Sequence, residues 1–282
     1  MDTKLILFEG IPGSGKTTFA RETAEWYKRR NIPVNLFIEG QSHPADLSWC
    51  AVIPVAVYED LLVKYASLQN KIERQTVFEG ETAIVAHTQV RTDNRDFYKE
   101  LGSFEVYDGR VPDAVFFELH YNRWSSFAIK AAEKNELNIF ECAFLQNHVN
   151  ELLLWRDAVE SDIISHHNKL MDSVKNLSPF VIYLSQSDIK ETIRRIARER
   201  VSAEHGNWID QCIEYCENSP FGKKRGITGF DGVIEFFTIR KELEMKILAQ
   251  LSVPHVIIEN NDCDWDNVRT QIEDCLLRQE NF

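Results

Sequence analysis

The chain has 282 residues, of which 44% are hydrophobic and 27% are charged, so it can bury a full core. Its formal net charge of −12 argues against a nucleic-acid-binding or anionic-membrane surface, since either would need a basic face. The length allows one large domain or two small ones, and we predict a single domain over residues 1–282 with an insertion at 41–110.

An apolar run from Leu5 to Phe8 leads directly into Gly10 to Thr18, which fits the pattern G-x-x-x-x-G-K-[ST]. The run predicts a short buried parallel strand, and residues 18–30 predict a helix. In such a loop, backbone N–H groups surround phosphate oxygens, Lys16 reaches the β- and γ-phosphates, and the Thr17 hydroxyl is a ligand for Mg²⁺. The predicted nucleotide-binding residues are Gly10, Pro12, Gly13, Ser14, Gly15, Lys16, Thr17 and Thr18.

A second apolar run, from Pro33 to Gly40, predicts the next parallel strand, with Glu39 at its carboxyl end. Ligands of open α/β sheets bind at the carboxyl ends of strands, so Glu39 should emerge near the phosphate-binding loop. Residues 41–110 have a mixed pattern, helical near 59–74 and extended at 82–90, and we interpret them as an insertion that selects an acceptor molecule. The candidate pocket residues are His43, Trp49, His87 and His120.

The rest of the chain alternates between helical and strand patterns. A helix is predicted from Pro112, although residues 114–118 also fit a strand. Further strands are predicted at 137–144, 180–184 and 256–258, and further helices at 149–155, after Asp188 and at 265–277. This alternation predicts an α/β fold, in which helices cover both faces of a parallel sheet.

The order of these parts resembles the P-loop kinases of small molecules, in particular nucleoside and nucleotide kinases such as thymidylate kinase. The resemblance rests on Gly10 to Thr18, on Glu39-Gly40, on the strand at 139–141, and on Tyr183-Leu184 followed by an arginine-rich helix. It implies the P-loop NTPase three-layer sandwich, with a parallel five-stranded sheet and a helical or mixed insertion after the second strand. It also implies ATP and Mg²⁺ as cofactors.

The resemblance assigns roles to residues at matching positions. Glu39 takes the place of the acid that orients the acceptor hydroxyl. Where such kinases have Asp-Arg after the third strand, this chain has Glu141-Cys142, so the acid that supports Mg²⁺ is present and the phosphate-binding arginine is missing. Arginines that could replace it from the insertion side are Arg91, Arg110 and Arg123.

Two basic segments match a lid that closes over the donor phosphates. In the helix after Asp188, Arg194 and Arg198 share a face and are our candidates. The segment from Gly222 to Gly226 is predicted to be a loop that either closes on phosphates or lies in solvent.

We therefore predict an ATP- and Mg²⁺-dependent phosphotransferase that acts on a small-molecule hydroxyl or phosphate. Its catalytic residues would be Lys16, Glu39, Arg194 and Arg198, and its metal ligands Thr17 and Glu141. The alternatives are an antibiotic- or metabolite-modifying kinase and a nucleotide-dependent switch or assembly ATPase. A GTPase is disfavoured because Asn-Lys-x-Asp is absent from the sequence, Asn70 to Glu73 being only a near match.

The six cysteines form no C-x-x-C pair, so we expect reduced thiols and no zinc site. No apolar stretch approaches the roughly 20 residues that span a bilayer, and the N-terminus shows no cleavable apolar segment. These features predict a soluble cytoplasmic protein that binds neither nucleic acid nor membranes. They are compatible with a homodimer.

Overall fold

The computed structural model describes residues 3–202, 206–261 and 263–280. The chain forms two compact units, the first from Met1–Leu36 with Ala128–Phe282 and the second from Phe37–Phe127. The segment 41–110 lies within the second unit, and the single-domain organisation stays a prediction. Among the described residues, no helix combines the length and the apolar character that a membrane span requires.

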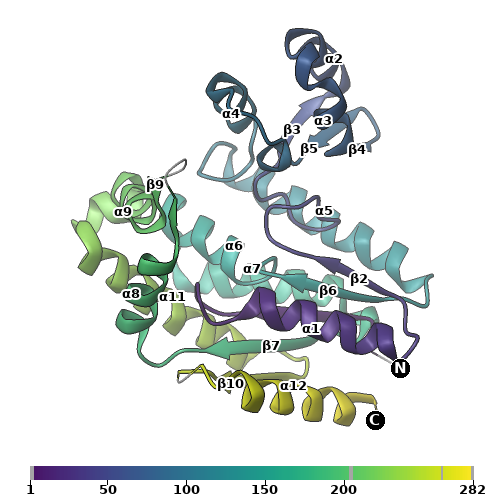
Figure 1. Cartoon of the computed structure of the whole chain (residues 1–282), viewed down its shortest axis with the longest axis vertical. Coiled ribbons are helices and arrows are strands. Elements are labelled where there is room, and N and C mark those ends of the chain that lie inside the picture. The colour runs from purple at the N-terminus through teal and green to yellow at the C-terminus, as the bar shows by residue number, and fades with distance from the viewer. Residues whose placement is uncertain (1–2, 203–205, 262, 281–282) are drawn as a thin grey trace. The chain divides into compact units, whose positions relative to one another are not determined.

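A sheet of five parallel strands forms the centre of the first unit, in the order β10-β7-β1-β6-β2 (Figure 1). Its strands are β1 (Leu5–Glu9), β2 (Val34–Phe37), β6 (Leu137–Glu141), β7 (Phe180–Ser185) and β10 (His255–Glu259). Every residue of β1, β6 and β7 is buried, because helices cover both faces of the sheet, and this explains their unbroken apolar runs. The predicted P-loop NTPase fold with a parallel five-stranded sheet is confirmed.

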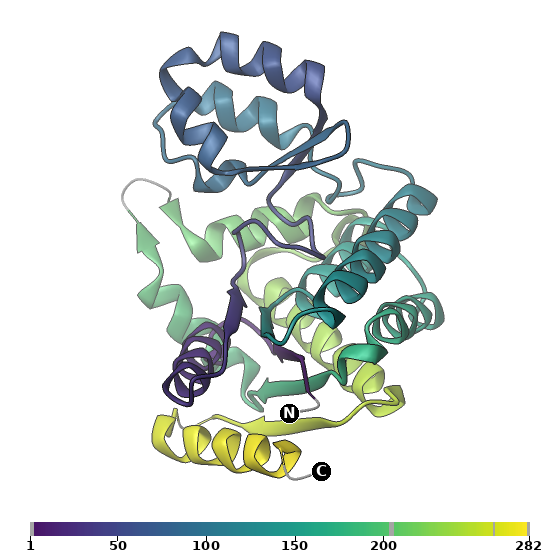
Figure 2. The same cartoon turned by 90° about the vertical axis from the view of Figure 1, so that its right-hand side faces the viewer.

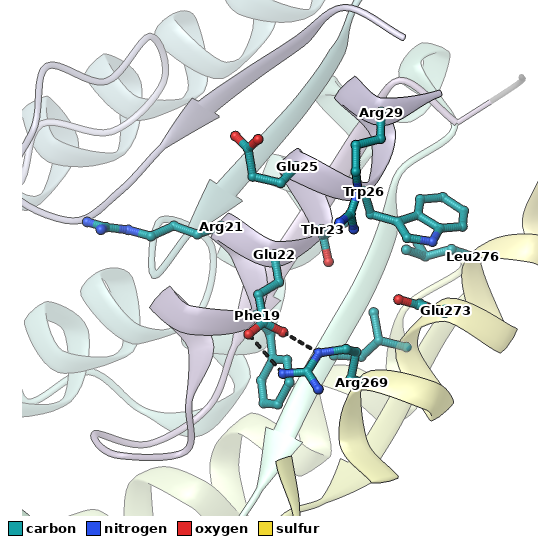
Figure 3. A pocket seen from close by; sticks show the side chains of 11 residues that line it. Phe19, Arg21, Glu22, Thr23, Glu25, Trp26, Arg29, Arg269, Glu273 and Leu276 are labelled. Carbon is teal, nitrogen blue, oxygen red and sulfur yellow. Dashed lines mark hydrogen bonds and ion pairs between the residues drawn. The ribbon is translucent and has the colours of Figure 1, made fainter. Parts of the chain in front are cut away.

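Two helices, α1 (Lys16–Arg29) and α12 (Trp265–Glu280), cover one face of this sheet (Figures 1 and 2). Their apolar side chains, among them Phe19 and Ile272, form one core with alternate residues of the central strands. The other face meets α11 (Gly229–Gln250), whose Glu244 accepts a hydrogen bond from the Tyr183 hydroxyl of β7 at 2.6 Å. Beside α11 lies α7 (Glu160–Ser173).

The remaining elements of the first unit follow β6 and β7 in the chain. They are α6 (Gln146–Asn150), the π-helix η3 (Glu151–Trp155), η4 (Lys175–Leu177), α8 (Ile189–Glu199), β8 (Val201–Ser202), β9 (Gly206–Asn207), α9 (Trp208–Asn218) and α10 (Pro220–Arg225). The predicted strand at 137–144 ends at Glu141, and the predicted helix at 149–155 is the end of α6 followed by η3.

The basic segment from Gly222 to Gly226 is not the predicted loop, because all but its last residue belong to α10. Pro220 occupies the first turn, and the Ser219 hydroxyl caps it by accepting the Gly222 amide at 2.9 Å. A Cβ at Gly222 would lie 1.9 Å from the Cys216 carbonyl oxygen, so close packing, and not mobility, explains this glycine. Lys224 forms an ion pair with Asp157 at 2.5 Å.

The second unit contains a three-stranded antiparallel sheet in the order β3-β5-β4. Its elements are β3 (Ala51–Pro54), α2 (Val55–Lys64), η1 (Ala66–Leu68), α3 (Gln69–Arg74), β4 (Thr76–Glu79), β5 (Thr82–Val85), η2 (His87–Gln89), α4 (Arg95–Gly102) and α5 (Asp113–Ala132), which continues into the first unit. The predicted helical stretch at 59–74 is therefore divided among α2, η1 and α3, and the predicted extended stretch at 82–90 ends at Val85. Residues 114–118 are helical, so the helix is the correct one of the two predicted alternatives.

Candidate active site

The loop between β1 and α1 has the backbone of a phosphate-binding loop. Gly10, Gly13 and Gly15 have φ angles of 141°, 80° and 99°, which residues with a side chain rarely adopt. A Cβ at Gly13 would lie 1.8 Å from Cδ1 of Ile196, and one at Gly10 would lie 2.4 Å from the Leu184 carbonyl oxygen. The glycines therefore serve both conformation and close packing, and α1 begins at Lys16, directly after the loop.

Lys16 folds back over this loop. Its ammonium donates a hydrogen bond to the Ile11 carbonyl oxygen at 3.0 Å, and its side chain is buried. The Ser14 hydroxyl is also buried and has no hydrogen-bond partner among the described residues. A cation and an unsatisfied hydroxyl within a ring of backbone amides suit an anionic oxygen ligand.

The predicted metal pair meets at the carboxyl end of β6. The Thr17 hydroxyl donates a hydrogen bond to Oε1 of Glu141 at 2.9 Å, and the Cys142 thiol donates to the same oxygen at 3.0 Å. Glu141 is buried, and Cys142 has a φ of 67°, which turns the chain sharply away from the strand. A hydroxyl and a carboxylate are oxygen ligands of the kind that Mg²⁺ prefers, so these residues fit that ion.

A buried ion pair between Arg240 and Glu244 contacts the backbone of the loop. Arg240 of α11 donates to the Gly10 carbonyl oxygen at 3.2 Å, to Glu244 at 2.6 Å and to the Asn150 side chain at 3.1 Å. Arg240 and Glu244 are both 0% exposed, so removing either one would leave the other as an unpaired buried group. The pair therefore ties the first glycine of the loop to α6 and α11.

The acid before the loop, Glu9, is the last residue of β1 and is completely buried. Its carboxylate accepts backbone N–H bonds from Phe144 at 2.7 Å and from Gln146 at 3.0 Å, at the start of α6. Burial raises the pKa of Glu9 from 4.5 to about 7, because desolvation outweighs the backbone hydrogen bonds that favour the charged form.

A second arginine, Arg195 of α8, also contacts the loop: it donates to the Gly13 carbonyl oxygen at 3.1 Å and contacts the Cys263 sulfur. The two predicted lid arginines lie elsewhere on α8: Arg194 pairs with Glu191 at 3.0 Å, and Arg198 lies 4.0 Å from the same carboxylate. Their side chains are 42% and 71% exposed, so their role in a lid stays a prediction.

Glu39 and the other predicted acceptor-side residues belong to the second unit. Glu39 is exposed and lies in a turn, because β2 ends at Phe37 and not at Gly40. Its catalytic role stays a prediction. Trp49 is 47% exposed and adopts a positive φ of 62°.

The histidines of the second unit lie in buried polar clusters. Nδ1 of His43 accepts the amides of Ala45 at 3.1 Å and Asp46 at 2.8 Å, and burial lowers the pKa of His43 to about 4. Asp46 accepts the Tyr107 hydroxyl at 2.5 Å and lies 3.7 Å from Nε2 of His120. This part of the chain therefore buries acids and histidines that a simple packing unit would not need.

Two of the three arginine candidates, Arg110 and Arg123, are already paired. Arg123 donates to the His43 carbonyl oxygen at 2.8 Å and contacts Glu79. Arg110 lies 3.1 Å from Glu105, whose other oxygen is 2.5 Å from His87. Arg91 is exposed. Of the three, Arg123 is the most deeply buried cation, at 6% exposure.

No protein-family model and no curated protein matches the chain. Among solved structures, the chain is similar to the YorR protein of Bacillus subtilis in complex with phosphorylated GDP, with 13% identity and a TM-score of 0.44 over 99% of this chain and 98% of that one. It is also similar to thymidylate kinase from Ehrlichia chaffeensis, with 15% identity and a TM-score of 0.39 over 98% of each chain. At these values the fold is assigned from the strand order and the loop of this chain alone.

Proposed function

We propose that this protein is a P-loop kinase, which transfers the γ-phosphoryl group of ATP to a hydroxyl or phosphate oxygen of a small-molecule acceptor. The observation that carries the proposal is the hydrogen bond between Thr17 and Glu141, directly beside a glycine loop over which Lys16 folds back. Bound Mg²⁺ would neutralise charge on the donor phosphates. Glu141 and Thr17 would hold it.

The residues of the loop would act by binding and charge stabilisation. Lys16 would exchange the Ile11 carbonyl for phosphate oxygens, and the amides from Gly13 to Thr18 would surround the transferred group. Because Glu141 already accepts the Thr17 hydroxyl, the two metal ligands need little rearrangement to bind an ion.

The second unit supports a kinase over a switch ATPase. It inserts a separately packed body with buried Asp46, His120 and Arg123 directly after β2, where acceptor recognition would be expected. A switch ATPase would need no such buried polar chemistry. An antibiotic or another metabolite fits this proposal as well as a nucleoside or nucleotide does.

The test is incubation of the purified protein with γ-labelled ATP, Mg²⁺ and a panel of nucleosides, nucleotides, aminoglycosides and cell metabolites. Transfer of label to one class of acceptor supports the kinase and names its substrate. Slow release of labelled phosphate with every acceptor, accelerated by a protein fraction, supports the switch ATPase instead.

We expect Thr17→Ala and Glu141→Gln to raise the Mg²⁺ concentration needed for nucleotide binding, because the first removes an oxygen ligand of the ion and the second removes the negative charge of the other ligand. The measurement is a titration of Mg²⁺ against a fluorescent ATP analogue. Thr270→Ala on α12 is the control, since its hydroxyl only bonds the Asp266 carbonyl of its own helix. An unchanged Mg²⁺ requirement in Glu141→Gln would remove this residue from the metal site.

We also expect Glu39→Gln to lower kcat by roughly 10²-fold while ATP affinity stays nearly constant, the range expected for loss of a general base. Steady-state kinetics with the acceptor found in the panel measure both values. Glu59→Gln is the control, because Glu59 is likewise exposed on the second unit. Loss of ATP binding with normal kcat would assign Glu39 to the metal.

A further inference from the structure

β10 is an edge strand of the central sheet, and within the described part of the chain its outer side pairs with no other strand. Among the described residues, β7 is the only strand that pairs with β10 (Figure 1). Its residues alternate in burial: Ile258 is 1% exposed and packs in the core, whereas His255, Ile257 and Glu259 are exposed, Ile257 at 48%. Natural edge strands usually carry a lysine, a proline or a bulge, and none stands at these three positions.

The hydrogen bonds to β7 fix which way the backbone of β10 points. The Val181 amide donates to the Pro254 carbonyl at 3.2 Å, and the Asn260 amide donates to the Ser185 carbonyl at 2.9 Å. In a parallel pair, alternate residues turn both their N–H and C=O groups to one neighbour, so the even-numbered residues of β10 face β7. The N–H and C=O groups of His255, Ile257 and Glu259 therefore point away from the sheet.

His255, Ile257 and Glu259 are complementary to the same three residues of a second chain. When a second β10 runs antiparallel, with the two-fold axis at Ile257, each His255 lies opposite a Glu259 and the two Ile257 side chains meet. All three pairs join outward-facing backbone groups, which allows about six backbone hydrogen bonds. Oε1 of Glu259 accepts the Ser187 amide at 2.8 Å, which leaves Oε2 for the imidazole of the other copy.

We propose that two copies of this chain associate through antiparallel pairing of β10, which joins their central sheets into one. The pairing combines a backbone ladder, an apolar Ile257 contact and two cross-strand pairs of His255 with Glu259. A shift of register by two residues would place Ile257 opposite Glu259 or His255, so the side-chain pattern selects the register centred on Ile257. The interface lies wholly on the first unit.

The test is sedimentation velocity of the full chain from low to high micromolar concentration. We expect a reversible dimer that Ile257→Lys and Ile257→Pro each weaken by about tenfold or more, by burying a charge or by removing an outward amide. The proline spares the β7 ladder, whose bonds come from even-numbered residues. Ile129→Lys is the matched control, because Ile129 is 65% exposed elsewhere on the same unit.

Charge reversal tests the register separately. Glu259→Lys and His255→Glu should each weaken the dimer, and the double variant His255→Glu with Glu259→Lys should restore it, because opposite charges again face each other. Circular dichroism melting checks that each variant is folded. A wild-type chain that stays monomeric throughout, or a dimer that tolerates Ile257→Lys as well as Ile129→Lys, overturns the proposal.

Discussion

Lys16→Ala is expected to abolish phosphoryl transfer while the protein stays folded. The lysine ammonium is the cation that the loop itself supplies, and removing one preorganised charge or donor from such a site costs about 10²–10³-fold in rate or more. Among the described residues the ammonium bonds only the Ile11 carbonyl, and loss of this hydrogen bond costs about 1 kcal/mol of stability. The rate of label transfer from ATP and a thermal melt measure the two effects.

Lys28→Ala serves as the matched control, because Lys28 lies on the same helix and pairs only with Glu25 at the surface. It should leave both the rate and the melting temperature almost unchanged. Normal turnover in Lys16→Ala would remove the loop from the mechanism, and with it the basis for calling the protein a kinase.

The features predicted correctly from sequence are those fixed by local pattern. The strands β1, β6 and β7 are buried on both faces, so each reads as an unbroken apolar run. The glycine loop is recognisable because its chemistry is contained in nine consecutive residues, Gly10 to Thr18. Thr17 and Glu141, predicted as metal ligands from the motif and the resemblance, lie together because β1 and β6 are neighbours in the sheet, and their role toward a metal stays a prediction.

Element ends were predicted less well. Apolar character continues past the end of β2 to Ile38 and past the end of β6 to Phe144, although the strands themselves end at Phe37 and Glu141. The residues that follow β6 are buried against other elements, so hydrophobicity alone cannot locate the end of the strand. The glycine at 222 led us to predict a loop. Its true cause is close packing against Cys216, which cannot be recognised from the residues around position 222.

The support around the loop comes from distant parts of the chain. Arg240 reaches Gly10 across 230 residues, and Asn260 reaches the Ser14 carbonyl across 246, so no local spacing could have indicated either contact. Arg195 was passed over for Arg194 and Arg198, because a shared helical face does not say which face meets the loop. Glu9 did leave a signal, an acid that ends an apolar strand directly before the loop.

The free energy of unfolding of the first unit should respond to pH through two buried groups with opposite signs. Glu9 has a pKa raised from 4.5 to about 7 by burial, so its contribution is present below pH 4.5 and is lost as the pH rises to 7. His167 has a pKa lowered from 6.5 to about 4, also by burial, so its contribution is present above pH 6.5 and is lost as the pH falls to 4. In the wild type the two trends largely cancel.

Single variants separate the two trends. Relative to Glu9→Gln, the wild type should lose about 3 kcal/mol between pH 4.5 and 7, and relative to His167→Gln it should gain about 3 kcal/mol between pH 4 and 6.5. Urea denaturation across this pH range, followed by tryptophan fluorescence, measures both differences. A flat profile relative to Glu9→Gln would show that Glu9 is ionised throughout, held by its two backbone hydrogen bonds to the start of α6, and a flat profile relative to His167→Gln would contradict the lowered pKa of His167.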